Sequence, residues 1–282
     1  MFLDAETYLV YRDKYLLSWS MKGVAVIVIQ EKLNSRQKRN IFKERFGERL
    51  LSQGFIFKNN EFYRIHPGQV FLVVALGLWK GNTFIQFNAL PLCVGFTNKG
   101  IATIHERVDS FCRDEEERRY LLRPMEFERG RFDKQYDMFF DRIFHHFNEV
   151  HDVRSLLEFQ EGFIGRRPAN DRIRMLECIQ LGEYERATVY IDYEQQFYAK
   201  SLESRKRTLD QMRETSTSRK EDLEVITASF EEFKAYVESA SKELDKWTAW
   251  ISNKEYVTMQ RIIDKHCQQS DEVLSKMFPV FY

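Results

Sequence analysis

The stretch Phe55-Ile56-Phe57-Lys58-Asn59-Asn60-Glu61-Phe62-Tyr63-Arg64-Ile65 predicts a β-hairpin. Two short apolar runs flank Asn59-Asn60, and asparagine tolerates the positive φ angles that a tight two-residue turn requires. With these two residues as the loop, the strands meet in three favourable cross-strand pairs, Lys58–Glu61, Phe57–Phe62 and Ile56–Tyr63.

Two further strands follow the hairpin. His66-Pro67-Gly68 turns the chain into residues 70–79, and Gly81-Asn82 turns it again into residues 83–90. Residues 70–79 are apolar on both faces, which is typical of a central strand that is covered on both sides. We therefore predict an antiparallel β-meander, to which Cys93–Phe96 could add one more strand.

Helical patterns flank the meander. Residues 34–53 are amphipathic and end before Gly54, and residues 133–160 carry an apolar stripe through Phe139 and Phe147. Near the N-terminus, the apolar residues of segment 8–19 could lie on a helix, whereas the β-branched run Val24–Ile29 favours a strand. The glycine- and proline-containing segment 162–171 is the clearest boundary, so we predict an α+β domain over 1–165 and a helical domain over 171–282.

The helical domain contains an unbroken heptad row. Its spacings alternate between 3 and 4 through Leu223, Ile226, Phe230, Phe233, Val237, Ala240, Leu244, Trp247 and Ile251. This pattern predicts a helix over 219–251 that packs lengthwise against a helix over 183–213, with a turn at Thr215–Ser218. The fold class is therefore α+β, an antiparallel β-meander with flanking helices, followed by an all-α antiparallel helical hairpin or bundle.

Composition excludes several classes of protein. Lys plus Arg equals Asp plus Glu, 43 each, so no overall field draws the chain to nucleic acid or to an anionic membrane. The four cysteines, Cys93, Cys112, Cys178 and Cys267, form no CxxC pair, which suits reduced thiols. The longest wholly apolar run, Val24–Ile29, is far shorter than the ~20 residues that cross a bilayer. We expect a cytoplasmic protein without a membrane partner.

Two groups of residues resemble a known family. Gly54-Phe55 with Phe62-Tyr63-Arg64, and Phe139-Phe140-Asp141 with the segment 153–158, resemble a bacterial domain-of-unknown-function family, the DUF forty-three-zero-four type. The resemblance covers roughly residues 33–165. It implies the fold and a bacterial origin, and it brings no established activity.

A metal site is the first chemical hypothesis. On one continuous helix, Asp141, His145, Glu149 and Asp152 would share a face that could hold a metal ion for a hydrolase. The spacing departs from H-E-x-x-H, in which two histidines stand four residues apart. A solvated helix face explains the pattern better, so we predict no metal ligand and no cofactor.

A nucleic-acid contact is the second hypothesis. Residues 32–49 hold seven basic residues against two acidic ones, and a basic helix can lie along phosphates. The candidate residues are Arg36, Lys38, Arg39, Lys43, Arg45 and Arg49. A second group, Arg166, Arg167, Arg172 and Arg174, could serve the same purpose, or could instead cap carbonyl groups or pair with acidic residues at the domain junction.

The sheet offers one more candidate site. Gln86 and Asn88 would stand opposite Gly77 and Ala75, so that two amides line a shallow polar recess. Such a recess could bind a ligand or a peptide. A covering helix that forms hydrogen bonds with both amides is the alternative, because buried amides usually have structural partners.

Glycine-rich phosphate loops and nucleophile motifs are absent from the sequence, so we predict a non-enzymatic protein that acts through protein–protein contact. The C-terminal helices would provide the surface, because several aromatic residues lie beside the heptad row, and aromatic residues are enriched at interfaces. The partner is an unidentified protein, which includes a second copy of this chain. The candidate contact residues are Tyr190, Tyr193, Phe197, Tyr236, Trp250 and Tyr256.

Overall fold

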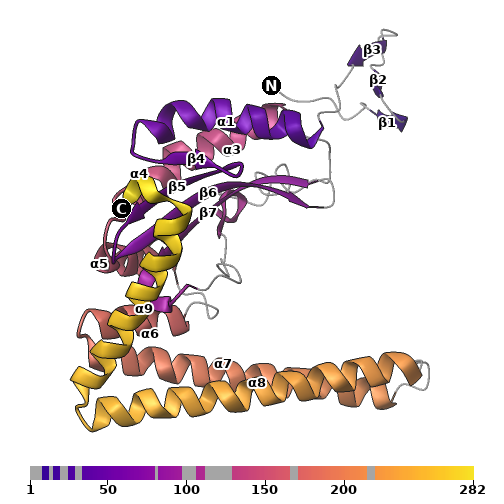
Figure 1. The fold of residues 1–282 in the computed structure, drawn as a ribbon. Helices are drawn as coiled ribbons and strands as arrows, with labels where there is room; N and C mark the ends of the chain where they lie inside the picture. Colours follow the sequence, from indigo (N-terminus) through magenta and orange to yellow (C-terminus); the bar gives the residue numbers. More distant parts are fainter. Residues whose placement is uncertain are drawn as a thin grey trace. The chain divides into compact units, whose positions relative to one another are not determined.

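A computed structural model describes residues 8–12, 15–19, 25–28, 34–79, 82–96, 106–111, 129–165, 171–214 and 220–282 (Figure 1). The chain divides into two compact units. The first consists of Met1–Arg64, Leu72–Asn88 and Ile104–Asn148, and the second of Ile65–Phe71, Ala89–Thr103 and Glu149–Tyr282. Whether two independent domains meet between residues 165 and 171 stays a prediction.

The predicted meander is present as a five-stranded sheet in the order β4-β5-β6-β7-β8. Its strands are β4 (Ile56–Lys58), β5 (Glu61–His66), β6 (Val70–Trp79), β7 (Asn82–Pro91) and β8 (Glu106–Arg107). The first hairpin has the predicted register, Ile56 with Tyr63, Phe57 with Phe62 and Lys58 with Glu61. Asn59 and Asn60 have φ angles of 52° and 67°, which confirms the tight turn.

β6 is the central strand, as predicted. Its residues 70–75 are all buried, so both faces of the strand are covered. The expectation of a further strand through Cys93–Phe96 is wrong. The chain instead forms a 3-10 turn, η1 (Leu92–Val94), and turns at Gly95, whose φ is 73°. Pro91 precedes this turn and cannot donate a hydrogen bond to a ladder, which explains why the strand ends there.

A separate three-stranded sheet precedes the first helix. It consists of β1 (Tyr8–Arg12), β2 (Tyr15–Trp19) and β3 (Ala25–Val28), with antiparallel pairing in the order β1-β2-β3. The strand predicted over Val24–Ile29 is therefore confirmed for its described residues, Ala25–Val28, and the helix over 8–19 is wrong. The two runs in this segment are only five residues each and rich in aromatic residues, which favours a hairpin over a helix.

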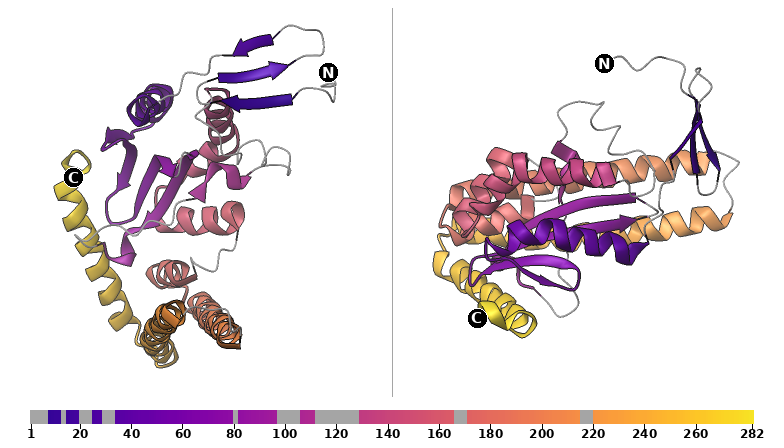
Figure 2. Two further views of the ribbon diagram at one scale, coloured as in Figure 1. Left: turned by 90° about the vertical axis from the view of Figure 1, so that its right-hand side faces the viewer. Right: turned by 90° about the horizontal axis from the view of Figure 1, so that it is seen from above.

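The helices of the first unit lie beside the five-stranded sheet (Figure 2). Their aromatic side chains contact one another and the sheet. α1 (Ser35–Leu51) begins with a capping box, in which Asn34 accepts from the Gln37 amide at 3.0 Å and the Gln37 side chain accepts from the Asn34 amide at 2.8 Å. The buried Phe46 of α1 contacts Phe139, with ring centroids 5.7 Å apart, and Phe139 in turn contacts Phe87 of β7 at 6.0 Å. These rings form the core of the unit.

The segment predicted as one helix over 133–160 is interrupted. It consists of α3 (Arg129–Met138), a π-helical turn η3 (Phe139–Ile143), α4 (Phe144–Asn148), α5 (Val153–Glu158) and a second π-helical turn η4 (Phe159–Ile164). The chain leaves helical geometry after Asn148, and Asp152 begins α5 by accepting from the Ser155 amide at 2.7 Å. The first π turn shifts the helical phase, so that adjacent Phe139 and Phe140 are both buried.

The second unit contains the remaining helices, α6 (Asp171–Gln180), α7 (Tyr184–Glu214), α8 (Lys220–Ser252) and α9 (Tyr256–Met277), with a final turn η6 (Pro279–Phe281). α7 and α8 pack lengthwise as an antiparallel pair, which confirms the predicted hairpin (Figure 1). The predicted turn at Thr215–Ser218 lies outside the described residues. Along the heptad row, Val237, Ala240, Leu244 and Trp247 are buried, whereas Leu223, Ile226, Phe230, Phe233 and Ile251 are half-buried.

The sequence led us to expect no membrane-spanning segment and reduced cysteine thiols. None of the helices in the described part of the chain is long and apolar enough to cross a bilayer. Cys93, Cys178 and Cys267 are free thiols, and Cys112 lies outside the described residues.

Candidate functional site

The α7–α8 pair is the element in which the sequence placed partner recognition. Its interior contains Ile191, Tyr198 and Leu209 of α7 and the four buried heptad residues of α8. Toward the far end of the pair, from residue 199 of α7 and up to residue 235 of α8, Leu209 is the one buried residue among those that the structure describes. The helices are therefore well covered near α6 and less so toward residue 214 of α7 and residue 220 of α8.

Four aromatic rings form a continuous row across the two helices. Phe197 and Tyr198 of α7 have ring centroids 6.1 Å apart. Tyr198 meets Tyr236 of α8 edge-on at 5.9 Å, with their hydroxyl oxygens 3.3 Å apart, and Tyr236 lies 6.3 Å from Phe233. We call Phe197, Tyr198, Phe233 and Tyr236 the aromatic patch.

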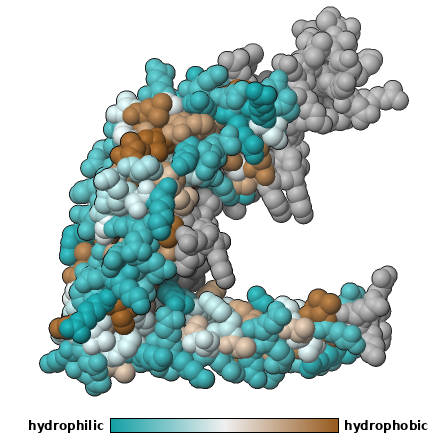
Figure 3. Space-filling view, in the orientation of Figure 1, coloured by the Kyte–Doolittle hydropathy of each residue, from teal (hydrophilic) through white to brown (hydrophobic). Residues whose placement is uncertain are grey.

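The outer members of the aromatic patch are open to solvent. Phe197 is 38% exposed and Tyr236 is 52% exposed, whereas Tyr198, which contacts both rings, is buried. The Arg205 guanidinium lies 4.0 Å from the centre of the Phe233 ring and covers part of it. The patch thus combines two exposed rings with a buried tyrosine, and tyrosine and arginine are among the residues enriched at the hot spots of protein interfaces. Figure 3 shows apolar side chains among the polar ones along this pair of helices.

The other four predicted contact residues lie elsewhere on the second unit. Tyr190 is buried, and its hydroxyl donates to Glu161, so it belongs to the core and not to an exposed surface. Tyr193 and Trp250 are half-buried against that core. Tyr256 is exposed on one side, and its ring stacks on Tyr184 with centroids 4.1 Å apart.

Sequence reasoning did not identify Tyr198 and Phe233 as parts of this surface. Both lie on the inner row of their helices, so their spacing indicates core positions. The missing signal is the alignment of α7 with α8, which decides that Tyr198 stands beside Tyr236.

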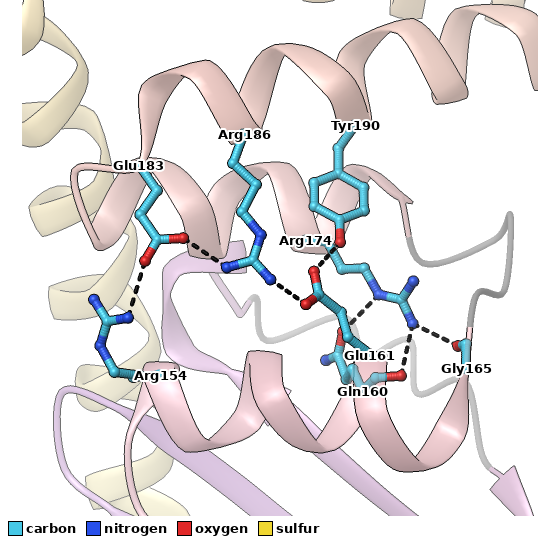
Figure 4. A network of polar contacts seen from close by, with 8 residues as sticks. All are labelled: Arg154, Gln160, Glu161, Gly165, Arg174, Glu183, Arg186 and Tyr190. Atoms are coloured by element: carbon cyan, nitrogen blue, oxygen red, sulfur yellow. Dashed lines mark hydrogen bonds and ion pairs between the residues drawn. The ribbon is translucent and has the colours of Figure 1, made fainter.

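A network of charged side chains lies at the base of the α7–α8 pair (Figure 4). Arg174 of α6 is 1% exposed and donates to the carbonyl oxygens of Gln160 at 3.1 Å and Gly165 at 2.7 Å. Arg172 pairs with Glu243 of α8 at 2.7 Å. The expectation that these arginines cap carbonyl groups and pair with acidic residues is therefore confirmed for these two residues; Arg166 and Arg167 are outside the described residues.

Glu177 is the most unusual member of the polar interior. It is fully buried on α6, and its Oε1 accepts a hydrogen bond from the side-chain Nε2 of Gln160 at 2.9 Å. Its Oε2 has no hydrogen-bond partner among the described residues. Burial raises the pKa of Glu177 to about 8, although nearby Arg174 opposes the shift. Because the carboxyl is kept from water, its neutral form is favoured in the folded state.

The rest of the network runs across three helical segments. Glu183 accepts from Arg186 at 2.7 Å and from Arg154 of α5 at 2.9 Å, and these hydrogen bonds lower its pKa. Arg186 also pairs with Glu161, which accepts from the Tyr190 hydroxyl. These contacts fasten α7 to α5 and η4, so the base of the helical pair is rigidly held.

The basic residues of α1 mostly contact other parts of the first unit. Arg45 pairs with Asp133 at 2.7 Å, and Lys38 lies 3.4 Å from the Thr83 hydroxyl. Lys43 and Arg49 lie over the rings of Phe57 and Phe140, at 5.2 Å and 4.0 Å from the ring centres. Arg36 and Arg39 are exposed on the first turns of the helix.

The residues considered for a metal site do not share one helix. Asp141 lies in η3 and His145 in α4, Glu149 follows the end of α4, and Asp152 caps α5. The break after Asn148, which the sequence pattern did not reveal, separates them. Within the described segments, no group of three or more His, Cys, Asp or Glu side chains is placed to hold a metal ion.

The expected polar recess of the sheet is occupied by a ring. A Cβ atom built on Gly77 would lie 2.3 Å from the Phe84 side chain, so Phe84 covers this glycine. The Arg107 guanidinium lies 4.2 Å from the centre of the Phe84 ring, and the backbone of Arg107 pairs with Gln86. Gln135 of α3 accepts a hydrogen bond from the backbone amide of Ile85 at 2.7 Å.

Comparisons of the chain with protein-family models, with curated proteins and with solved structures find no match. The resemblance to the DUF forty-three-zero-four type therefore stays a prediction, and the candidate site rests on its geometry alone.

Proposed function

We propose that this chain is a non-enzymatic, bacterial cytoplasmic protein that binds another protein through its α7–α8 pair. The aromatic patch lies at the centre of the contact. The observation that carries the proposal is the pair of exposed rings, Phe197 and Tyr236, each of which contacts the buried Tyr198.

Rigidity supports this choice of surface. Binding orders the side chains it uses, which costs about 0.5–1.5 kcal/mol for each flexible side chain. Tyr236 is already positioned by its contacts with Tyr198 and Phe233, and the base of the hairpin is held by the charged network. A partner therefore meets a preformed surface.

The alternative, a nucleic-acid accessory protein that uses α1, has less support. Among its six candidate residues, Lys38, Lys43, Arg45 and Arg49 contact side chains of the first unit. A phosphate would have to compete with these contacts, which leaves Arg36 and Arg39 as the exposed charges free of such a cost.

The test compares the full-length wild type with Phe197→Ser/Tyr236→Ser in the native cell. Each tagged chain is cross-linked, captured and its bound proteins are quantified. The matched control is Tyr256→Ser, which also removes an exposed ring but outside the aromatic patch. Circular dichroism establishes that all three chains are folded.

We expect the double variant to bind its partner at least about tenfold more weakly than the wild type does, so that less of the specific partner is captured. A tenfold change in affinity corresponds to about 1.4 kcal/mol of binding free energy. The Tyr256→Ser control should bind like the wild type. Equal capture by the double variant and the wild type would overturn the proposal.

A further inference from the structure

The far halves of α7 and α8 carry opposite charges. Residues 199–214 of α7 contain five basic and three acidic residues, whereas residues 220–235 of α8 contain two basic and five acidic residues. One helix of the pair is therefore net positive and the other net negative over the same stretch.

The ion pairs that the structure shows in this stretch lie within α7, and none of them joins the two helices. Arg207 pairs with Glu203 at 2.5 Å and Arg213 lies 3.9 Å from Asp210, and both pairs lie within α7. Arg205 covers the Phe233 ring. No ion pair links α7 to α8 in the parts of these helices whose side chains the structure describes.

Two exposed charges flank the aromatic patch on the same side of the hairpin. Lys200 follows Phe197 by three residues on α7, and Glu232 precedes Tyr236 by four residues on α8. Residues at these spacings are neighbours on a helix surface. The face that presents Phe197 and Tyr236 therefore presents a cation from α7 and an anion from α8.

We propose that the occupant of this face is a second copy of the chain, bound through a two-fold axis that sets α7 of each copy on α8 of the other. Phe197 then packs on the partner subunit's Tyr236, and Lys200 pairs with the partner subunit's Glu232. The proposal rests on the proposed function, because it names the partner of the same surface.

Charge selects this arrangement over its alternative. A two-fold axis that set α7 on α7 would bring the two net positive helices together, and like charges across an interface disfavour binding. A two-fold contact is self-complementary, so both the ring pair and the ion pair occur twice. The equal numbers of acidic and basic residues in the whole chain leave no net repulsion between copies.

The test uses charge reversal and mixing of full-length chains, with mass measured by sedimentation at several concentrations. The variants are Lys200→Glu and Glu232→Lys. Each alone places like charges opposite each other in a dimer of identical chains. In an equimolar mixture, a dimer that contains one chain of each variant again has two pairs of opposite charge. One pair is the original Lys200 with Glu232, and the other has the two charges exchanged.

We expect the wild type to dimerise, each variant to dimerise at least about tenfold more weakly, and the mixture to regain the wild-type affinity within about threefold. The matched control is Glu231→Lys on the same helix, one residue away from Glu232 and pointing to a different side, which should dimerise more tightly than Glu232→Lys.

Two outcomes overturn the second copy as the partner: a wild type that stays monomeric, or variants whose mixture binds no better than either alone. These outcomes are separate from a failure of the proposed function. If Phe197→Ser/Tyr236→Ser abolishes capture of a different protein while the wild type is monomeric, the surface binds a foreign partner and only the present inference fails.

Discussion

Replacing Glu177 by glutamine should change how the stability of the protein depends on pH. The glutamine side chain keeps the shape of the carboxyl and its oxygen can still accept the 2.9 Å hydrogen bond from Gln160. What it removes is the ionisable group in a fully buried position. The variant thus separates the effect of protonation on stability from the effect of side-chain packing.

The direction of the effect follows from the two pKa values. Burial raises the pKa of Glu177 from its ordinary value of 4.5 to about 8 in the folded state. Between these two values the folded chain holds a proton that the unfolded chain has released, so stability falls as pH rises through this window. Below 4.5 both states hold the proton and the contribution is fully present.

The magnitude follows from the same numbers. One unit of pKa difference corresponds to about 1.4 kcal/mol, so the contribution of Glu177 should fall by about 2 kcal/mol between roughly pH 6 and pH 8. Other groups that titrate in this range are shared by wild type and variant, and their effects cancel in the comparison.

The assay is urea unfolding followed by circular dichroism at both pH values. The wild type should lose about 2 kcal/mol more stability between them than Glu177→Gln does. The control Glu158→Gln removes an exposed carboxyl from α5 and should behave like the wild type. Equal pH dependence in wild type and Glu177→Gln would refute the reasoning that this carboxyl is protonated near neutral pH.

Three further predictions concern stability, each checked by urea unfolding. Arg174→Met should lower the free energy of unfolding by about 3 kcal/mol, because the buried carbonyl oxygen of Gln160 and the partly buried carbonyl oxygen of Gly165 lose their donor; a loss as small as that of exposed Arg39→Met would contradict this role. Trp247→Ala should lower the free energy of unfolding by about 3–5 kcal/mol, whereas Phe230→Ala, at a half-buried position of the same heptad row, should lower it clearly less. Equal losses would contradict the uneven burial along this row. Gly77→Ala should cost about 1–3 kcal/mol because the Phe84 ring must move, and Gly162→Ala, whose added Cβ meets nothing within 4 Å, should cost less; the reverse order would be inconsistent with the packing of Phe84.

Local chemistry made parts of the fold predictable. Asn59-Asn60 and its flanking residues determined the register of the first hairpin, and the apolar run 70–79 identified the central strand. The helix break after Asn148 was missed because the apolar stripe continues in phase on either side of it. The capping pair Asp152 and Ser155 was the local signal that could have revealed it.

The site was less predictable than the fold. Periodicity showed that α8 has a partner, but the heptad row does not tell how completely each position is covered, and Phe230 and Phe233 are only half-buried. Among the six aromatic candidates, spacing alone could not separate Tyr190, which is buried against Glu161, from Phe197 and Tyr236, which are exposed. The charged network joins residues from Arg154 to Tyr190, and that meeting depends on how α5, α6 and α7 pack.

The uneven burial along the α7–α8 pair has a consequence for its motion. Amide hydrogens near Trp247 and Leu244 lie where the interior is continuous, so they should exchange with solvent only when the unit opens as a whole. Amides beyond Phe230 are held by fewer buried contacts, and local opening should release them much sooner. The aromatic patch lies between these two regions, so a protein that binds there should slow exchange in the far halves of α7 and α8 while leaving exchange near Trp247 and Leu244 unchanged.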